Sequence, residues 1–164
     1  MQLKIHSDAS YLNEPKARSR IGGHFYLGDT EPNPPIPKFN GAILNNTGAL
    51  KHVASSAAEA EFGGLFVNAK EGTVIRNTLE DLGWKQTPTQ LTTDNSTAHG
   101  IINDTIKQQR SKAMDMRFCW VRDRCDQKQF VADWKPGSSN KGDYFTKHHT
   151  SAHHVRVRPN YLFI

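Results

Sequence analysis

Cysteine is scarce in this sequence, with only two among the 164 residues. Cys119 and Cys125 lie six positions apart on a segment whose pattern predicts a helix. That spacing fits no zinc motif, and a helix would hold the two thiols where they could not bridge. We expect two free thiols, which suits a reducing compartment such as the cytoplasm.

Long apolar runs are also lacking. No segment approaches the roughly 18 consecutive apolar residues that cross a bilayer, and the first residues contain no signal-peptide core. The lack of apolar runs argues against a membrane partner, and the early start of the first predicted strand suggests a domain cut from, or encoded within, a longer protein. Hydrophobic residues make up 36% of the chain and gather in short segments, so we expect one globular domain.

Positive charge is unevenly spread along the chain. Residues 105–164 contain 12 Lys and Arg but only 5 Asp and Glu, whereas residues 1–104 contain 9 and 11. A basic half beside an acidic half suits a protein that binds a polyanionic backbone on one surface and metal ions on another. A solvated basic surface without a partner would give the same composition, so charge alone leaves both interpretations open.

Apolar periodicity divides the chain into strands and helices. Five strands are predicted at residues 3–8 (reaching about residue 11), 21–27, 41–44 with 50–53, 89–94 and 130–134. Helices are predicted at residues 58–82, either unbroken or divided near Gly72 and ending at Gly83, and at 96–102, 111–126 and 139–148. The pattern predicts an α/β fold with a mixed five-stranded sheet, three antiparallel strands followed by parallel ones, and helices on both faces.

Four acidic residues lie where predicted elements begin or end. Asp8 and Asp94 end strands. Glu61 and Asp143 stand near the starts of helices. Nucleases that use two divalent ions about 3.5–4 Å apart need about four carboxylates at one point. Mg²⁺ prefers such oxygen ligands, and the ends of rigid elements can hold them in place.

Glu59 and Glu61 compete for the helical position in this set. Ser56 and Glu59 have the spacing of a capping box, in which Glu59 would reach back to the backbone N–H of Ser56. That gives Glu59 a structural role. Glu61 is left, one turn into the helix, as the expected metal ligand.

Five short motifs follow one another in a recognisable order. They are Ser-Asp-Ala-Ser (7–10), Ser-Ser-Ala-Ala-Glu-Ala-Glu-Phe (55–62), Thr-Asp-Asn-Ser-Thr-Ala (93–98), Arg-Ser-Lys-Ala-Met-Asp-Met-Arg-Phe (110–118) and Lys-Gly-Asp-Tyr-Phe-Thr-Lys (141–147). The ordered set resembles the ribonuclease H domain of copia-type LTR retrotransposon polyproteins, from about residue 5 to 150. Each motif is weak alone, and the order gives the resemblance its weight.

The resemblance implies a ribonuclease H-like fold and hydrolysis of the RNA strand of RNA–DNA hybrids with two Mg²⁺ ions, for which Mn²⁺ could substitute. By position, Asp8 matches the family's first-strand aspartate and Glu61 its helix glutamate. Asp94 matches the fourth-strand aspartate, and Asp143 the aspartate of the C-terminal helix. Cellular ribonucleases H also carry a histidine in the loop before the last aspartate. The loop at residues 135–140 has none, which puts the turnover rate in doubt but not the metal site.

Substrate contacts are expected around these ligands. Ser10 and Asn95 follow Asp8 and Asp94 closely enough to meet the 2′-hydroxyls that distinguish RNA from DNA. Ser56, at a helix start, could place backbone amides on a DNA phosphate.

The basic helix predicted at residues 111–126 could grip backbone phosphates farther along, with Lys112 and Arg117 as the expected contacts. For each of these residues an ordinary cap, turn or solvated surface position is the alternative.

The last part of the chain is basic and rich in histidine. We divide the chain into a catalytic domain at residues 1–148 and a basic tail at residues 149–164. His148, His149, His153 and His154 are suitable zinc ligands, but the run offers no cysteine or acidic partner. A flexible segment that packs loosely or touches substrate is the preferred interpretation.

The favoured function is therefore a ribonuclease H acting on RNA–DNA hybrid, beside a reverse transcriptase domain or alone as a monomer. The resemblance suggests the cytoplasm or a virus-like particle as its location. Two alternatives stay open: another nuclease of the same fold that acts on DNA, and a hybrid-binding domain without activity. The presence of all four carboxylates argues against the second.

Overall fold

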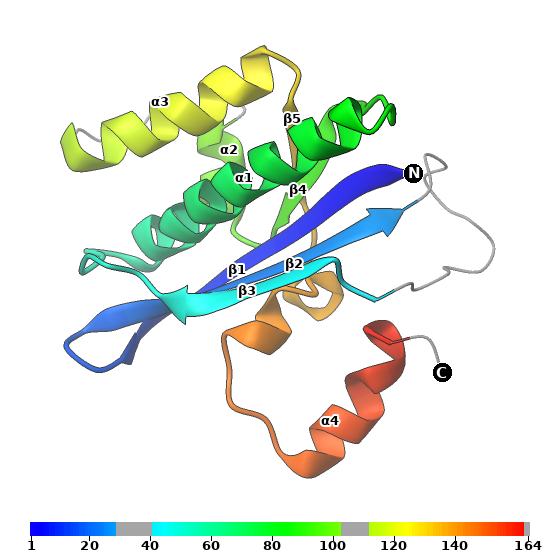
Figure 1. Ribbon diagram of the computed structural model, residues 1–164. Helices are drawn as coiled ribbons and strands as arrows, with labels where there is room; N and C mark the ends of the chain where they lie inside the picture. The colour runs from blue at the N-terminus through cyan, green and yellow to red at the C-terminus, as the bar shows by residue number, and fades with distance from the viewer. Residues whose placement is uncertain (29–40, 103–111, 163–164) are drawn as a thin grey trace.

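The computed structural model describes residues 1–28, 41–102 and 112–162, apart from the side chains of residues 98, 101 and 112–115. Its centre is a five-stranded sheet in the order β3-β2-β1-β4-β5 (Figure 1). The strands are β1 Gln2–Glu14, β2 Arg18–Gly28, β3 Leu44–Ala49, β4 Thr89–Thr93 and β5 Phe130–Trp134. Pairing is antiparallel in β1–β2 and β2–β3 and parallel in β1–β4 and β4–β5. The predicted mixed sheet is confirmed.

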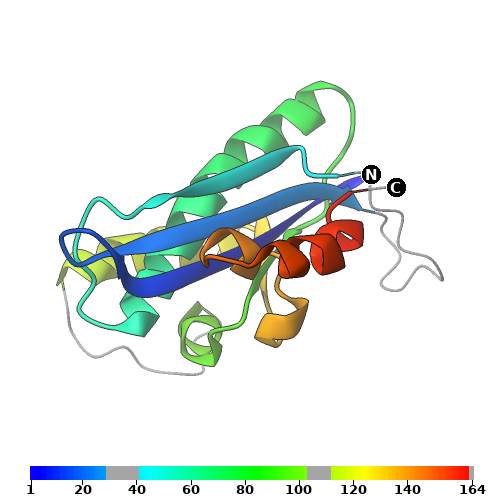
Figure 2. The same ribbon diagram turned by 90° about the horizontal axis from the view of Figure 1, so that it is seen from below.

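Helices cover both faces of this sheet. The helices α1 Ala57–Asp81, α2 Ser96–Ile102 and α3 Lys112–Asp126 lie on one face, and α4 Ser151–Val157 lies on the other (Figures 1 and 2). The central strand β1 is therefore covered on both sides, which explains its run of buried residues from Ile5 to Asp8. Within the described part of the chain, no helix is long and apolar enough to cross a membrane.

The main hydrophobic core fills the space between the sheet and α1 with α3. Phe62 of α1 and Phe118 of α3 stack with their ring centroids 3.5 Å apart. Leu3, Leu65 and Leu91 are almost completely buried in the same cluster. Burial of this kind stabilises the fold by roughly 1.5–3 kcal/mol for each large side chain. Cys119 and Cys125 both carry free thiols.

Helix α1 is continuous over its 25 residues, so the suggested division near Gly72 does not occur. A Cβ atom at Gly72 would lie 2.4 Å from Cδ1 of Ile5. The glycine is therefore needed for close packing of the helix on β1 rather than for a break. The helix ends as predicted, because Gly83 follows its C-cap with φ +87°.

Two predicted elements are wrong in position. The third strand is a single segment, Leu44–Ala49, because residues 44–49 pair with β2, whereas residues 41–43 and 50–53 lie outside the strand. No helix spans residues 139–148: the chain instead forms two short 3-10 turns, Gly137–Ser139 and Asp143–Phe145. The last helix, α4, lies within the segment that we expected to be a tail.

The irregular path before Asp143 has a physical cause in its contacts with β1. The side chain of Asn140 donates to the carbonyl of Ser7 at 2.8 Å, and the backbone N–H of Lys141 donates to Nδ1 of His6 at 3.0 Å. These two bonds tie the segment to the central strand along an irregular path. Local sequence pattern cannot reveal such bonds, which explains the wrong prediction.

Candidate metal centre

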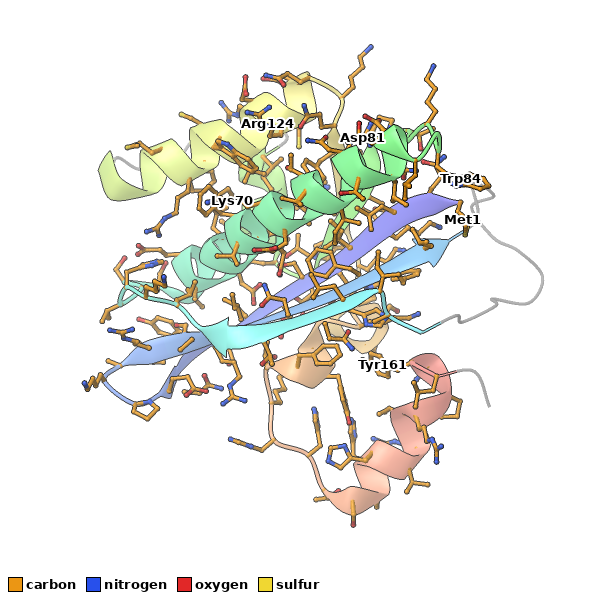
Figure 3. The ribbon with its side chains drawn as sticks, in the orientation of Figure 1. Met1, Lys70, Asp81, Trp84, Arg124 and Tyr161 are labelled. Carbon is orange, nitrogen blue, oxygen red and sulfur yellow. The ribbon has the colours of Figure 1, made fainter. Side chains whose placement is uncertain are left out.

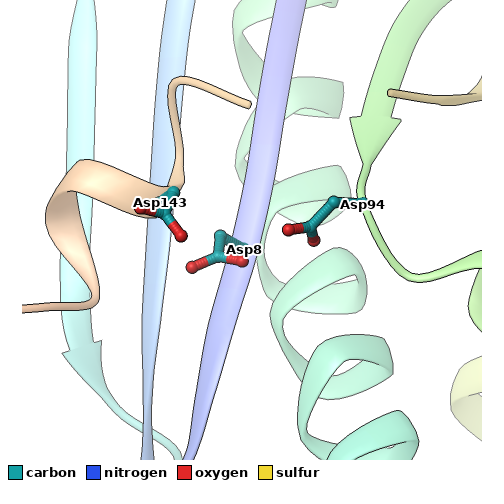
Figure 4. A group of neighbouring side chains, drawn as sticks. All are labelled: Asp8, Asp94 and Asp143. Carbon is teal, nitrogen blue, oxygen red and sulfur yellow. The ribbon is translucent and has the colours of Figure 1, made fainter. Parts of the chain in front are cut away.

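Three aspartates from distant parts of the chain converge at one edge of β1. Asp8 lies on β1, Asp94 directly follows β4, and Asp143 opens the second 3-10 turn. One carboxylate oxygen from each lies within 4.8 Å of the other two. Figure 4 shows the three side chains pointing toward one another, with Asp8 between the others. The strands β1 and β4 are parallel neighbours, with His6 opposite Thr92. Asp8 and Asp94 each stand two residues beyond this pair, so the two aspartates lie side by side.

Close backbone packing places Asp143 and Asp94 beside β1. A Cβ atom at Gly142 would come within 3.0 Å of the backbone nitrogen of Asp8, so only glycine lets the turn approach this closely. A Cβ atom at Gly137 would lie 2.9 Å from Oδ2 of Asp94. The indole of Trp134 donates to the carbonyl of Asp94 at 2.9 Å. These contacts preorganise the site.

Glu61 adds a fourth carboxylate from α1. Its side chain is 8% exposed, and its Oε2 has no hydrogen-bond partner among the described residues. Burial, together with the charges of Asp8 and Asp94, raises the pKa of Glu61 to about 9, and a hydrogen bond with the Ala9 backbone opposes this rise. Glu61 is therefore near enough to both aspartates for their charges to act on it, although it lies outside the group whose oxygens meet within 4.8 Å.

Asp8 is the most constrained of the aspartates. Burial raises its pKa to about 6; a hydrogen bond from the Thr146 hydroxyl opposes this rise, and the charges of Asp94 and Asp143 add to it. Carboxylates held this close repel one another in water-poor surroundings. Lys147 offsets part of this charge through its ion pair with Asp143.

The residues fit a divalent cation. Three converging carboxylates and an unpartnered buried oxygen on Glu61 supply the hard oxygen ligands that Mg²⁺, Mn²⁺ or Ca²⁺ take. A bound cation would also remove the repulsion that raises the pKa values of Asp8 and Glu61. The arrangement is that of a carboxylate metal site, and it does not by itself choose the metal.

Comparison with known proteins agrees with this architecture. The N-terminal ribonuclease H domain of Rv2228c from Mycobacterium tuberculosis has a similar structure, with a TM-score of 0.60 and 14% identity over 88% of this chain and 90% of that one. LC11-RNase H1, solved in complex with an RNA/DNA hybrid, gives 0.63 and 12% over 88% and 93%. This chain has the ribonuclease H fold.

A sequence relative points to mobile elements. The ribonuclease H-like domain is 27% identical over 145 residues to the retrovirus-related Pol polyprotein from transposon TNT 1-94 of Nicotiana tabacum. The match covers 88% of the chain but only 10% of that polyprotein. No protein-family model matches the sequence. The chain is thus similar in sequence to a short part of a retrotransposon polyprotein, and its structural neighbours share the ribonuclease H fold.

Ser10 and Asn95, which the sequence suggests as substrate contacts, differ in their hydrogen bonds. Ser10 is half-buried, and its Oγ is a buried atom with no hydrogen-bond partner among the described residues. Asn95 is half-buried directly after Asp94, and its backbone N–H donates to Thr93 Oγ1 at 3.2 Å. Both residues lie close in sequence to the aspartates, and their substrate roles stay predictions.

Ser56 begins α1, and its hydroxyl accepts a hydrogen bond from the backbone N–H of Glu59 at 3.1 Å. The capping box is only half correct, because the Glu59 carboxylate accepts from the backbone N–H of Ser55 at 2.7 Å instead of that of Ser56. Glu59 still has the structural role that the sequence assigned. Since the Ser56 hydroxyl is engaged, backbone amides are what this turn could offer a phosphate.

The two basic contacts expected on α3 differ in what the structure shows. The side chain of Lys112 lies outside the described residues. Arg117 forms a hydrogen bond with Nε2 of His52 at 2.7 Å and lines a cavity of about 440 Å³ with Lys51 and Lys70. Three basic residues around one cavity are compatible with backbone binding, and the role of Arg117 stays a prediction.

Sequence reasoning missed two residues that touch the aspartates. Thr146 donates to Asp8, and Lys147 pairs with Asp143. Lys147 follows Asp143 by four positions, a spacing that would have suggested a contact on a helix. Nothing in the sequence marks Thr146, whose partner is 138 positions away.

Proposed function

We propose that this domain is a ribonuclease H that hydrolyses the RNA strand of RNA–DNA hybrids with Mg²⁺, during reverse transcription of a copia-type retrotransposon. The observation that carries the proposal is the convergence of Asp8, Asp94 and Asp143 within 4.8 Å, with the buried carboxylate of Glu61 near enough to two of them to be affected by their charges. A ribonuclease H fold with this carboxylate set matches the chemistry of phosphodiester cleavage.

The four carboxylates would hold two Mg²⁺ ions, with Mn²⁺ as a substitute. When bound, the ions would supply an activated water and stabilise the charge on the leaving oxygen. Asp8, on β1, and Asp94, directly after the neighbouring strand β4, would hold the ions together with Glu61 and Asp143. The reaction adds the water oxygen to phosphorus and releases the 3′ oxygen, leaving a 5′-phosphate and a 3′-hydroxyl.

The chain's own residues set up this geometry. Thr146 holds Asp8 by a hydrogen bond to Oδ2, so this carboxylate is fixed before substrate arrives. Gly142 and Asn140 keep the turn that carries Asp143 pressed against β1. Fixed ligands of this kind lower the reorganisation that the reaction must otherwise include.

Recognition of RNA would fall to polar groups near the aspartates. Ser10 has a buried hydroxyl without a described partner, two residues after Asp8. A 2′-hydroxyl can both donate to and accept from such a group. Asn95 is the residue directly after Asp94. The two residues together would give the site a physical basis for preferring the RNA strand.

The wider setting is proposed on the same basis. Similarity to a retrovirus-related Pol polyprotein supports a neighbouring reverse transcriptase and a location in the cytoplasm or a virus-like particle. The solved complex of LC11-RNase H1 with RNA/DNA hybrid supports the substrate class. We propose a catalytic unit at residues 1–148, which acts as a monomer when isolated.

A cleavage assay tests the proposal. Labelled RNA–DNA hybrid, double-stranded RNA and double-stranded DNA are incubated with Mg²⁺ and with either wild type or Asp94→Asn. Cutting of the hybrid's RNA alone, lost in the variant, is the expected result. Cutting of DNA would favour a different nuclease of the same fold. Hybrid binding without cutting in Mg²⁺ or Mn²⁺ would favour a binding domain.

A further inference from the structure

A cavity of about 390 Å³ opens beside the metal centre, on the face of the sheet that carries α4. The turn at residues 137–141 and Asp143 form one wall, and α4 with Asn160 and Tyr161 forms the other. Its size lies within the range of about 300–1,000 Å³ typical of ligand sites. Asp143 belongs to this lining and to the carboxylate cluster, so the cavity adjoins the point where a phosphate would be cut.

The lining of the cavity suits an anion. Asp143 is its single acidic residue, whereas Lys141, His153 and Arg156 are basic. Ser138 and Ser139 contribute hydroxyl groups. The Lys141 ammonium lies 4.6 Å from the centre of the Tyr26 ring and is thus held to one side. Arg156 is consequently the strongest candidate for a direct contact.

Arg156 has donors to spare. It is exposed, and its guanidinium contacts Nδ1 of His153 at 2.9 Å. Among the described residues, no carboxylate forms an ion pair with it. A guanidinium carries five N–H donors in a fork that matches the oxygens of a phosphate.

Contacts on both sides fix the wall that carries Arg156. Tyr161, labelled in Figure 3, donates from its hydroxyl to the carbonyl of Lys141 at 2.9 Å. Its ring lies 5.0 Å from that of Tyr144, and Tyr144 in turn stacks on His149 at 4.9 Å. The Tyr144 hydroxyl also bonds to Nδ1 of His154. Helix α4 is therefore tied to the turn that carries Asp143.

We propose that Arg156 and this cavity bind a backbone phosphate of the cleaved strand, next to the phosphate held at the carboxylates. The inference deepens the proposed function and rests on it for the identity of the strand. It gives the C-terminal segment a role in substrate binding. It also explains why α4 is packed against the catalytic turn rather than left in solvent.

Salt-dependent binding of a short RNA–DNA hybrid tests this site. Each protein carries Asp94→Asn so that the hybrid stays intact, and affinity is measured by fluorescence anisotropy in Mg²⁺ over a series of NaCl concentrations. Adding Arg156→Gln should lower the slope of log affinity against log salt by about one, the signature of one lost phosphate contact. Arg156→Lys should restore most of the slope.

Arg158→Gln is the matched control. It removes the same charge two residues along the chain, but Arg158 lines a different cavity, beside His24 and Phe145. Its slope should equal that of the parent. Thermal melting of each variant verifies the fold. Equal slopes for Arg156→Gln and the parent, or no hybrid binding by the parent, would overturn the site.

A neutral methylphosphonate linkage identifies the strand. Placed in the RNA next to the cut, the linkage should lower the hybrid affinity of the Arg158→Gln protein, which keeps Arg156. It should leave the hybrid affinity of the Arg156→Gln protein unchanged, because that protein lacks the arginine that would contact this phosphate. An equal response in both, or a response only to linkages in the DNA strand, contradicts the assignment. Cleavage by the wild-type chain is scored separately. If the wild-type chain cuts hybrid but Arg156→Gln leaves the salt slope unchanged, the proposed function stands and the phosphate site is wrong. If Arg156→Gln lowers the slope but the wild-type chain does not cut, the phosphate site stands and the proposed function is wrong.

Discussion

The hydroxyl of Thr146 donates a hydrogen bond to a carboxylate oxygen of Asp8, across 138 positions of sequence. Both groups are buried, and the bond opposes the rise in the Asp8 pKa that burial causes. It joins the turn that carries Asp143 to the central strand. The contact therefore couples the positions of two carboxylates of the candidate metal centre, and its removal should weaken the binding of a cation there.

Thr146→Val removes the hydroxyl and keeps the shape of the side chain. Losing a charge-assisted bond of this kind costs roughly 1.5–3 kcal/mol, so half-maximal cleavage should require roughly ten- to a hundredfold more Mg²⁺. Cleavage against Mg²⁺ concentration measures this, with Thr146→Ser expected to behave as wild type. Thr78→Val is the control, because the Thr78 hydroxyl bonds only to the carbonyl of Val74 among the described contacts. An unchanged Mg²⁺ requirement would mean that the bond does not position Asp8.

Asp94→Asn should stabilise the metal-free protein while abolishing activity. It removes one of the charges that raise the pKa values of Asp8 and Glu61. We expect a gain of about 1–2 kcal/mol in the free energy of unfolding in EDTA. Mg²⁺ should stabilise wild type by mass action and the variant much less. Urea unfolding with and without Mg²⁺ measures both effects.

Glu71→Gln serves as the control for Asp94→Asn, since Glu71 is an exposed acid of α1. It should respond to Mg²⁺ as wild type does. Equal Mg²⁺ stabilisation of Asp94→Asn and wild type would contradict a metal site at the three aspartates.

His24 should make the protein less stable in mild acid. Burial lowers its pKa to about 4, a hydrogen bond with Asn45 opposes this, and the charge of Lys141 adds to it. Because the folded pKa lies below the unfolded value of about 6.5, its contribution is complete above pH 6.5 and is lost as pH falls toward 4. The loss amounts to about 3 kcal/mol.

The comparison of wild type with His24→Gln isolates this contribution, because Asp8 and Glu61 titrate in both proteins. The difference between their unfolding free energies, measured in urea at several pH values, should shrink between pH 6.5 and 4. A constant difference across that range would show that His24 does not stay neutral in the folded state.

Part of this site could be read from the sequence, for physical reasons that differ among its residues. Asp94 directly follows an apolar strand as predicted, whereas β1 continues past Asp8 to Glu14, so Asp8 does not end its strand. The parallel register of β1 and β4 nevertheless brings the two positions together. Glu61 followed from the capping role of Glu59. The surroundings of Asp143 could not be predicted, because a long-range bond from the Asn140 side chain to β1 helps to hold this segment in an irregular turn.

Helix α4 shows the same limit. It has seven residues, which is too few for a helix to be stable alone in water. Its N-cap, Thr150, accepts from the backbone N–H of His153. The ring contacts of Tyr144 and Tyr161 then hold the segment in place. Those contacts depend on the tertiary fold, so sequence pattern indicated only a basic tail.

Lys147→Met should increase the affinity of the metal-free protein for a divalent cation. The Lys147 ammonium pairs with Asp143, and the charges of Asp8 and Asp94 also hold the lysine pKa above its usual value. It therefore competes with a cation for the same carboxylates. Since the side chain is 55% exposed, screening limits the effect to about 1 kcal/mol, or roughly fivefold in affinity.

Calorimetric titration with Mn²⁺ in the absence of nucleic acid measures this competition. Lys147→Arg should keep the wild-type affinity, because it retains the charge. Lys70→Met, which removes an exposed charge from α1, should change the affinity little. Unchanged or weaker Mn²⁺ binding by Lys147→Met would show that the lysine is not a competitor. Lys147 would then position the Asp143 carboxylate, and its loss would disorder that ligand instead of making it available to the cation.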